Sequence, residues 1–138
     1  MSICLFIAAE ECSLRSIGLG GNGITAAGGL ALAKALRVNK SLESLGLAGN
    51  VLGMWRNNCI RLSVLFNLDS FPESEGCEYL CEALRVNTTL RKLILSSNGI
   101  DDFGVKALAD SLTVNATLHT LVRLLVMLFR LFSLSYED

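Results

Sequence analysis

The stretch from Arg85 to Leu118 reads RVNTTLRKLILSSNGIDDFGVKALADSLTVNATL and contains two hydrophobic periods, one after the other. Leu93 and Leu95 are two residues apart, a spacing that places both side chains on one face of a β-strand. Leu108 and Leu112 are four residues apart, which places them on one face of an α-helix. The stretch therefore predicts a short strand, a turn and an amphipathic helix, each of which needs a neighbour to bury its apolar side.

The same pattern recurs along the chain. Its copies open with Leu14, Leu42, Leu90 and Leu118; the first and last intervals between these leucines are equal, and the middle interval is longer. A recurring strand, turn and helix of this length is typical of a solenoid, in which parallel strands line a concave face and helices line the convex face. We expect helices near 26–37, 75–86 and 103–114 and three strands paired in parallel. The leucines expected in the core are Leu45, Leu47, Leu93 and Leu95.

Asparagines recur at two positions of the pattern. Those that follow the strands are Asn22, Asn50 and Asn98. We expect each to be a buried amide that satisfies backbone groups of the turn. Those that follow the helices are Asn39, Asn87 and Asn115, and each begins an N-x-S/T sequence, the glycan acceptor of secreted proteins. Their identical repeat position favours a structural role, in which an unmodified asparagine adopts a left-handed or turn conformation.

The full phrase, L-x-x-L-x-L-x-x-N-x-I-x-x-x-G-x-x-x-L-x-x-x-L-x-x-N, resembles the ribonuclease-inhibitor class of leucine-rich repeats. Residues 85–118 are especially similar to repeats of NACHT-domain (NOD-like) receptors, and the match covers residues 13–53 and 75–121. The resemblance implies an α/β leucine-rich repeat solenoid of about three repeats plus partial ends. It also implies a cytoplasmic, non-enzymatic protein-interaction module of innate immunity that serves ligand sensing or autoinhibition. The alternative is a GTPase-activating or actin-regulating protein, because those also use similar repeats.

Two segments interrupt the pattern. In the third copy Gly104 follows Ile100 by about one helical turn, whereas in the middle copy the equivalent residues are Leu52 and Gly76, so the segment near 54–74 is an insertion. From residue 122 onward the pattern stops and the chain is almost entirely apolar. We therefore divide the chain into a degenerate N-terminal segment (1–12), a leucine-rich repeat domain (13–121) that contains the insertion, and an apolar C-terminal tail (122–138).

The tail has no transmembrane span, because its apolar run from Leu121 to Leu134 is shorter than the roughly 20 residues that such a helix needs. We expect it to form a helix that caps the end of the solenoid, and a helix lying on a membrane surface is the alternative. The insertion is also apolar, and both segments fit the hypothesis that they include retained intron sequence or come from a mis-drawn gene model. On that hypothesis the chain is a fragment of a longer repeat protein.

The composition excludes several functional classes. Of 138 residues, 51% are hydrophobic and 18% charged, and the formal net charge is −1, so neither a disordered chain nor a nucleic-acid-binding surface is expected. Five cysteines, an odd number, indicate a reduced intracellular environment. Cys77 and Cys81 have the spacing of two zinc ligands on a helix, but no second cysteine or histidine pair accompanies them. Buried thiols are therefore the expectation, and neither a metal nor a cofactor is predicted.

The sequence GLGGNG, from Gly18 to Gly23, satisfies the G-x-G-x-x-G pattern of dinucleotide-binding loops. At the positions equivalent to its three glycines, the second copy has glycine, alanine and valine and the third has isoleucine, serine and glycine. The same turn is therefore predicted without these glycines, and we interpret the loop as a solenoid turn. A nucleotide-binding enzyme that uses Gly18, Gly20 and Gly23 is the remote alternative.

No arrangement of residues supports catalysis. His119 is the only histidine, and no acidic pair recurs at a spacing typical of general acid–base chemistry. The candidate site is instead a partner-binding one on the concave face, where most side chains are small. The larger side chains, which we expect to provide directional contacts to a protein partner of unknown identity, are Arg15, Glu43, Arg91, Lys92 and His119.

Overall fold

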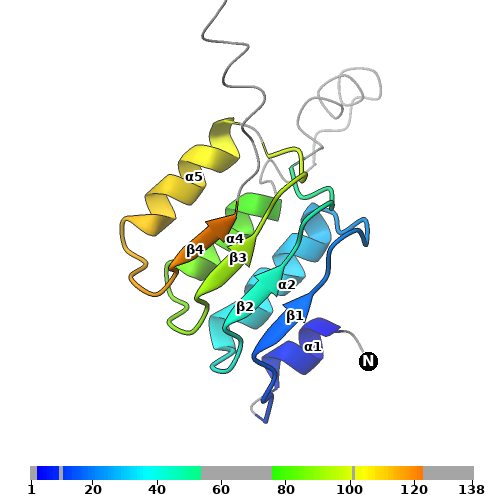
Figure 1. The fold of residues 1–138 in the computed structure, drawn as a ribbon, viewed down its shortest axis with the longest axis vertical. Helices are drawn as coiled ribbons and strands as arrows, with labels where there is room; N and C mark the ends of the chain where they lie inside the picture. The colour runs from blue at the N-terminus through cyan, green and yellow to red at the C-terminus, as the bar shows by residue number, and fades with distance from the viewer. Residues whose placement is uncertain (1–2, 10, 54–75, 101, 123–138) are drawn as a thin grey trace, which may run out of the picture.

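The computed structural model describes residues 3–9, 11–53, 76–100 and 102–122, and within them strands and helices alternate (Figure 1). The strands are β1 (Ser16–Gly18), β2 (Ser44–Gly46), β3 (Lys92–Ile94) and β4 (Thr120–Val122). The helices are α1 (Ile3–Ala8), α2 (Ala26–Val38), α4 (Gly76–Leu84) and α5 (Asp102–Leu112). The expected solenoid of strand, turn and helix is therefore confirmed.

All the strands belong to one parallel sheet in the order β1-β2-β3-β4. The register aligns Ser16 with Ser44, Ser44 with Lys92, and Lys92 with Thr120, which are equivalent positions of successive repeats. Figure 1 shows the helices together on one side of this sheet. The parallel pairing predicted from the repeats is confirmed, and a fourth strand extends it to Val122, one residue into the segment that the sequence assigned to the tail.

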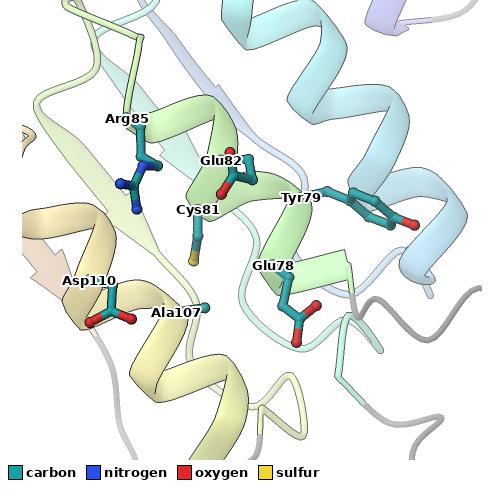
Figure 2. Close-up of a pocket in the computed structure, with 7 residues that line it drawn as sticks. All are labelled: Glu78, Tyr79, Cys81, Glu82, Arg85, Ala107 and Asp110. Carbon is teal, nitrogen blue, oxygen red and sulfur yellow. The ribbon is translucent and has the colours of Figure 1, made fainter.

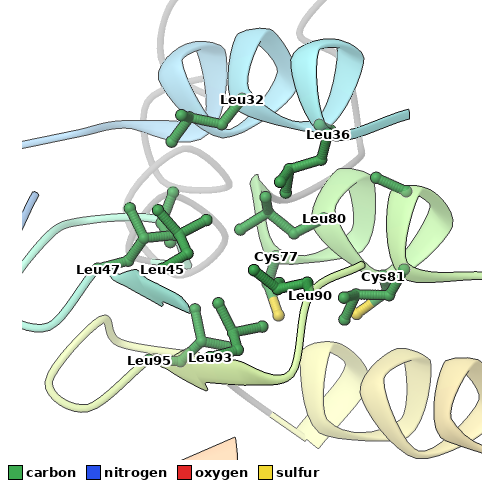
Figure 3. Close-up of a cluster of buried hydrophobic side chains, with 14 of the residues drawn as sticks. Leu32, Leu36, Leu45, Leu47, Cys77, Leu80, Cys81, Leu90, Leu93 and Leu95 are labelled. Carbon is green, nitrogen blue, oxygen red and sulfur yellow. The ribbon is translucent and has the colours of Figure 1, made fainter. Parts of the chain in front are cut away.

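The core lies between the sheet and the helices. The four leucines expected there are confirmed, because Leu45, Leu47, Leu93 and Leu95 are each at most 2% exposed. Figure 3 shows their side chains converging with leucines from α2 and α4. The predicted helices are found with small differences at their ends. α4 and α5 each end two residues early, because the N–H groups of Val86 and Val114 bond three residues back, to the carbonyls of Ala83 and Ser111, instead of four.

The residues on either side of the predicted insertion are in direct contact. The backbone N–H of Gly76 donates to the carbonyl of Leu52 over 3.0 Å, so the two halves of the middle repeat are joined. The insertion itself, near 54–74, and the tail after Val122 lie outside the described residues. Within the degenerate N-terminal segment, α1 packs beside α2 and buries Ile7. In the described part of the chain no helix is long and apolar enough to cross a bilayer.

Helices α2 and α4 approach closely through two glycines. A Cβ atom added at Gly29 would lie 2.8 Å from the Cα and 2.9 Å from the carbonyl oxygen of Gly76, and neither backbone atom can move without shifting α4. We expect Gly29→Ala to lower the free energy of unfolding by about 1–3 kcal/mol, the usual cost of overpacking a core. Thermal and urea unfolding measure this loss.

Gly18→Ala is the matched control for this prediction. A Cβ atom at Gly18 meets nothing within 4 Å, so we expect its free energy of unfolding to stay within about 0.5 kcal/mol of the parent. Equal stability of the two variants would contradict the close helix approach.

Candidate functional site

The sheet has one face toward the helices and one face away from them, which we call the concave face. Ile17, Leu45, Leu93 and Leu121 occupy the middle position of each strand and pack in or against the core. Because successive side chains of a strand point to opposite sides, the residues on either side of these four belong to the concave face. From β1 to β4 they are Ser16 and Gly18, Ser44 and Gly46, Lys92 and Ile94, and Thr120.

The residue before each strand forms a row along one edge of this face: Arg15, Glu43, Arg91 and His119. The carbonyls of Arg15, Glu43 and Arg91 each accept two backbone N–H bonds from the next repeat, as Arg15 does from Glu43 and Ser44 at 2.7 and 2.9 Å. These bonds fix the residues of the row at equivalent positions of successive repeats. All five predicted partner-binding residues are therefore brought together, with Lys92 in the adjoining row.

Two members of the row interact with each other. Arg15 Nη1 lies 2.7 Å from Glu43 Oε1, and the side chains are 78% and 41% exposed. A pair this exposed contributes at most about 1 kcal/mol to stability, because water screens it. Its main effect is to neutralise the only acidic side chain of the row. Sequence reasoning missed the pairing, although opposite charges at equivalent positions of successive repeats were the signal.

Arg91 and Lys92 are the free cations of the site. Both are exposed, and neither makes an ion pair within the described ranges 3–9, 11–53, 76–100 and 102–122. His119 is also exposed, but its Nδ1 atom donates to the carbonyl of Thr117, which orients the ring. The predicted residues thus fall into three groups. Arg15 and Glu43 neutralise each other, Arg91 and Lys92 remain basic, and the His119 ring is held by its own hydrogen bond.

The part of the concave face formed by β1 and β2, beside Arg91 and Lys92, carries only small side chains. A Cβ atom at Gly18 would meet no atom within 4 Å, and one at Gly46 would meet only the backbone of β1 at ordinary contact distance. Ser16 and Ser44 complete a patch of small side chains in front of β1 and β2. The concave face can therefore admit an extended or bulky group close to the backbone of the sheet.

The glycine-rich loop from Gly18 to Gly23 has the geometry of a solenoid turn. Gly21 has φ +70°, and the equivalent Gly49 and Ser97 also have positive φ, so the turn recurs even where the residue is serine. Three N–H groups of this turn already donate within the protein. Those of Asn22 and Ile24 donate to Asn50 Oδ1 at 3.1 and 2.9 Å, and that of Gly21 donates to Ala48 O at 2.8 Å.

The strand-end asparagines link neighbouring repeats. Asn50 Nδ2 donates to the carbonyls of Leu19 and Leu47, and Asn98 Nδ2 donates to those of Leu47 and Leu95. Both residues are less than 5% exposed, as predicted. The prediction was wrong for Asn22, whose side chain is exposed and donates only to Gly20 within its own loop, because no described strand precedes β1.

The helix-end asparagines form a second ladder. Asn39, Asn87 and Asn115 donate through Nδ2 to the preceding helix, at Ile7, Leu36 and Leu84 respectively, over 2.6–2.7 Å. Asn39 is not left-handed, because its backbone has φ −69° and ψ 135°. Its Oδ1 atom accepts from the N–H groups of Ser41 and Leu42, so it forms the turn that was the other expectation. The structural role itself is observed. Asn39 and Asn87 are about 5% exposed or less, so their amide nitrogens are bonded and covered where a glycan would attach.

Cys77 and Cys81 are buried in the core, as expected for small apolar side chains. The Cys77 thiol lies 3.8 Å from the carbonyl of Gly104, a weak contact with the next repeat. Among the described residues no three histidine, cysteine or acidic side chains are grouped so that they could hold a metal ion.

A shallow pocket of about 280 Å³ lies between α4 and α5 on the helix side (Figure 2). Its charged lining residues are Glu78, Glu82, Arg85 and Asp110, and Cys81 also lines it. Sequence reasoning placed no site here. The pocket is separate from the concave face, because the helices and the strands form opposite layers.

Comparison with known proteins identifies the repeats. The family model described as "Leucine Rich repeat" matches residues 11–33 and 86–109. "NACHT, LRR and PYD domains-containing protein 3" of Bos taurus is 32% identical over 137 residues, which are 92% of this chain and 13% of that protein. "Ribonuclease inhibitor" of Mus musculus is 32% identical over 120 residues, which are 80% of this chain and 26% of that protein. The chain thus spans about a quarter or less of the length of these relatives.

A solved structure shares the architecture. "Leiomodin-1 Actin-Binding Site 2 (ABS2)" aligns with a TM-score of 0.67 over 98% of this chain and 70% of that one, at 18% sequence identity. At this level of identity the likeness shows the fold alone.

Proposed function

Because this chain is a leucine-rich repeat solenoid of the ribonuclease-inhibitor type, we propose that it is a non-enzymatic module that binds a protein partner through its concave face. The observation that supports this most is the position of Arg91 and Lys92. They are exposed and lack an acidic partner within the described residues, and they stand beside a floor of small side chains that leaves room for a bound segment. Arginine is enriched among the residues that dominate binding energy at protein interfaces.

The charge of the concave face indicates what kind of partner segment would bind there. Arg15 and Glu43 cancel, so Arg91 and Lys92 leave the strand side basic although the whole chain has a net charge of −1. An acidic segment of the partner would complement this face and be steered toward it. The NACHT-containing relatives support the finer proposal that the module acts in ligand sensing or autoinhibition in the cytoplasm, as a fragment of a longer repeat region.

The other functions receive less support. The likeness to an actin-binding structure is one of fold, and no contact among the described residues favours an actin-regulating or GTPase-activating role. Nucleotide binding at Gly18, Gly20 and Gly23 would have to displace the bonds that Asn50 makes to the loop.

Site-specific photo-crosslinking tests where the partner binds. The photoreactive residue p-benzoylphenylalanine is placed at Gly18, where the concave face is open, or at Lys106, which is exposed on α5. The full chain carrying either residue is expressed in cells and irradiated. We expect a discrete crosslinked protein, identified by mass spectrometry, from position 18 and not from position 106. The reverse pattern would contradict the proposal.

Charge reversal on the concave face then tests the anchors. With the captured partner in purified form, we expect Lys92→Glu to raise the dissociation constant about tenfold or more, because one attractive contact becomes repulsive. Lys106→Glu, the same change on the helix side, should leave the constant within about twofold. Isothermal titration calorimetry measures both. Equal affinities for the two variants would place the interface elsewhere.

A further inference from the structure

The edge of the solenoid where the helices end carries exposed valines at equivalent positions. Val38, Val86 and Val114 lie at or just beyond the ends of α2, α4 and α5, and they are 57%, 53% and 55% exposed. We call these three residues the valine row. Figure 1 shows the loops that lead from these helices to the next strands gathered along one edge of the molecule. Helix α4 packs between α2 and α5 and still exposes its valine, so the stacking of repeats does not cover this row.

The valine row continues from repeat to repeat. Each valine directly precedes a helix-end asparagine, and these asparagines contact one another. Asn87 Nδ2 lies 3.5 Å from the carbonyl oxygen of Asn39, and Asn115 Nδ2 lies 3.1 Å from that of Asn87. The asparagines therefore fix the valines as neighbours along the edge. An apolar row of this kind differs from the single apolar side chains that are scattered over most protein surfaces.

The residues beside the valine row are basic or neutral. Arg37 and Lys40 flank Val38, and Arg85 directly precedes Val86. These basic side chains are exposed, and none of them forms an ion pair with another described residue. No acidic residue lies within two positions of a valine of the row in the sequence. The charge that borders the row is therefore positive, although the net charge of the whole chain is −1.

We propose that the valine row binds the surface of a membrane that contains anionic phospholipids. The valines enter the headgroup layer, and Arg37, Lys40 and Arg85 pair with the anionic groups of the lipids. Attachment of this kind combines the burial of apolar side chains with attraction to anionic lipids. Long basic side chains suit it, because their stems lie against apolar surface while their charges stay at the level of the headgroups.

Two other occupants match the row less well. A second copy of the chain, bound through the same row, would bring the basic side chains of both copies together, and like charges repel. The binding energy of a protein interface comes mainly from Trp, Tyr and Arg, and valine is under-represented among the residues that dominate it. An anionic membrane complements both the aliphatic row and the positive charge beside it.

Sedimentation with lipid vesicles tests the proposal on the full chain. Vesicles made of equal parts of phosphatidylcholine and phosphatidylserine are compared with vesicles of phosphatidylcholine alone. We expect the chain to bind the anionic vesicles, less tightly as salt is added, and to bind the neutral vesicles much more weakly. Equal binding to both kinds of vesicle, or no binding to the anionic ones, would overturn the proposal.

Charge reversal identifies the surface that binds the vesicles. Arg85 also lines the pocket between α4 and α5, so Arg37 is the clearer position to change. We expect Arg37→Glu to lower the partition coefficient about tenfold or more, because the change removes one attraction to the lipids and adds a repulsion. Lys106→Glu, the same reversal about two turns of α5 before Val114, should leave the partition coefficient within about twofold. Equal losses in the two variants would contradict the proposal.

Val86→Ser tests the apolar contribution. We expect the partition coefficient for anionic vesicles to fall about threefold or more, because less apolar area leaves water on binding. Phe103→Ser removes a similarly exposed apolar side chain from the start of α5 and should leave it within about twofold. Circular dichroism verifies that both variants are folded. The apolar tail is the same in every variant, so unchanged binding by Val86→Ser would place the membrane contact elsewhere and overturn the proposal.

Photo-crosslinking separates a membrane from a protein at this edge. The full chain with p-benzoylphenylalanine in place of Val86 is expressed in cells and irradiated. We expect crosslinks to lipid, identified by mass spectrometry. A discrete crosslinked protein from this position would show that a protein covers the row, and the proposal would be wrong.

Discussion

Replacing Leu93 with alanine is expected to lower the free energy of unfolding by about 2–5 kcal/mol, the range for truncating a buried leucine. Leu93 is 1% exposed and lies at the centre of the sheet, aligned with Leu45 on one side and Leu121 on the other. Its removal leaves a cavity between the strands and α4 that neighbouring side chains fill only in part. Urea unfolding followed by circular dichroism measures the loss.

Val86→Ala is the matched control for Leu93→Ala. Val86 follows α4 and is 53% exposed, so its truncation should change stability by no more than about 0.5 kcal/mol. A loss of that small size at Leu93 would contradict its place in the core.

Asn50→Ala is expected to have the second largest effect, a loss of about 2–4 kcal/mol, because each buried polar group left without a partner costs roughly 1–3 kcal/mol. The amide accepts from the N–H groups of Asn22 and Ile24 and donates to the carbonyls of Leu19 and Leu47. Alanine removes all four bonds, of which the three to Asn22, Ile24 and Leu19 join the second repeat to the first. Thermal and urea unfolding both report the loss.

The first repeat provides the comparison for Asn50. Asn22 occupies the equivalent position, but its side chain is exposed and donates only to Gly20. We expect Asn22→Ala to change the free energy of unfolding by less than about 0.5 kcal/mol. If both alanine variants lose the same stability, the amide ladder is not what joins the repeats.

The parallel register could be predicted from the sequence because each repeat repeats the same apolar positions. The spacing from Leu45 to Leu47 and from Leu93 to Leu95 fixes which side of each strand is buried, and the structure confirms it. The candidate site could be predicted as a set of positions for the same reason, since Arg15, Glu43, Arg91 and His119 are one register position.

The interactions between repeats could not be predicted in this way. The pairing of Arg15 with Glu43 depends on rotamers, and the bonds from Asn39 and Asn87 depend on how closely α1, α2 and α4 pack. Asn22 and Asn50 look alike in sequence and differ only in whether a neighbour covers them. A repeat sequence defines what each unit can bond to, and its position in the stack decides whether those bonds form.

The central claim is that the concave face binds the partner. NMR titration of the ¹⁵N-labelled full chain with the protein captured from position 18 tests it most directly. We expect the largest shifts at the amides of the strand rows, at Ser16, Gly18, Ser44, Gly46 and Lys92, with loss of these shifts in Lys92→Glu. Shifts confined to α2, α4 and α5, with the strand rows unchanged, would contradict the claim.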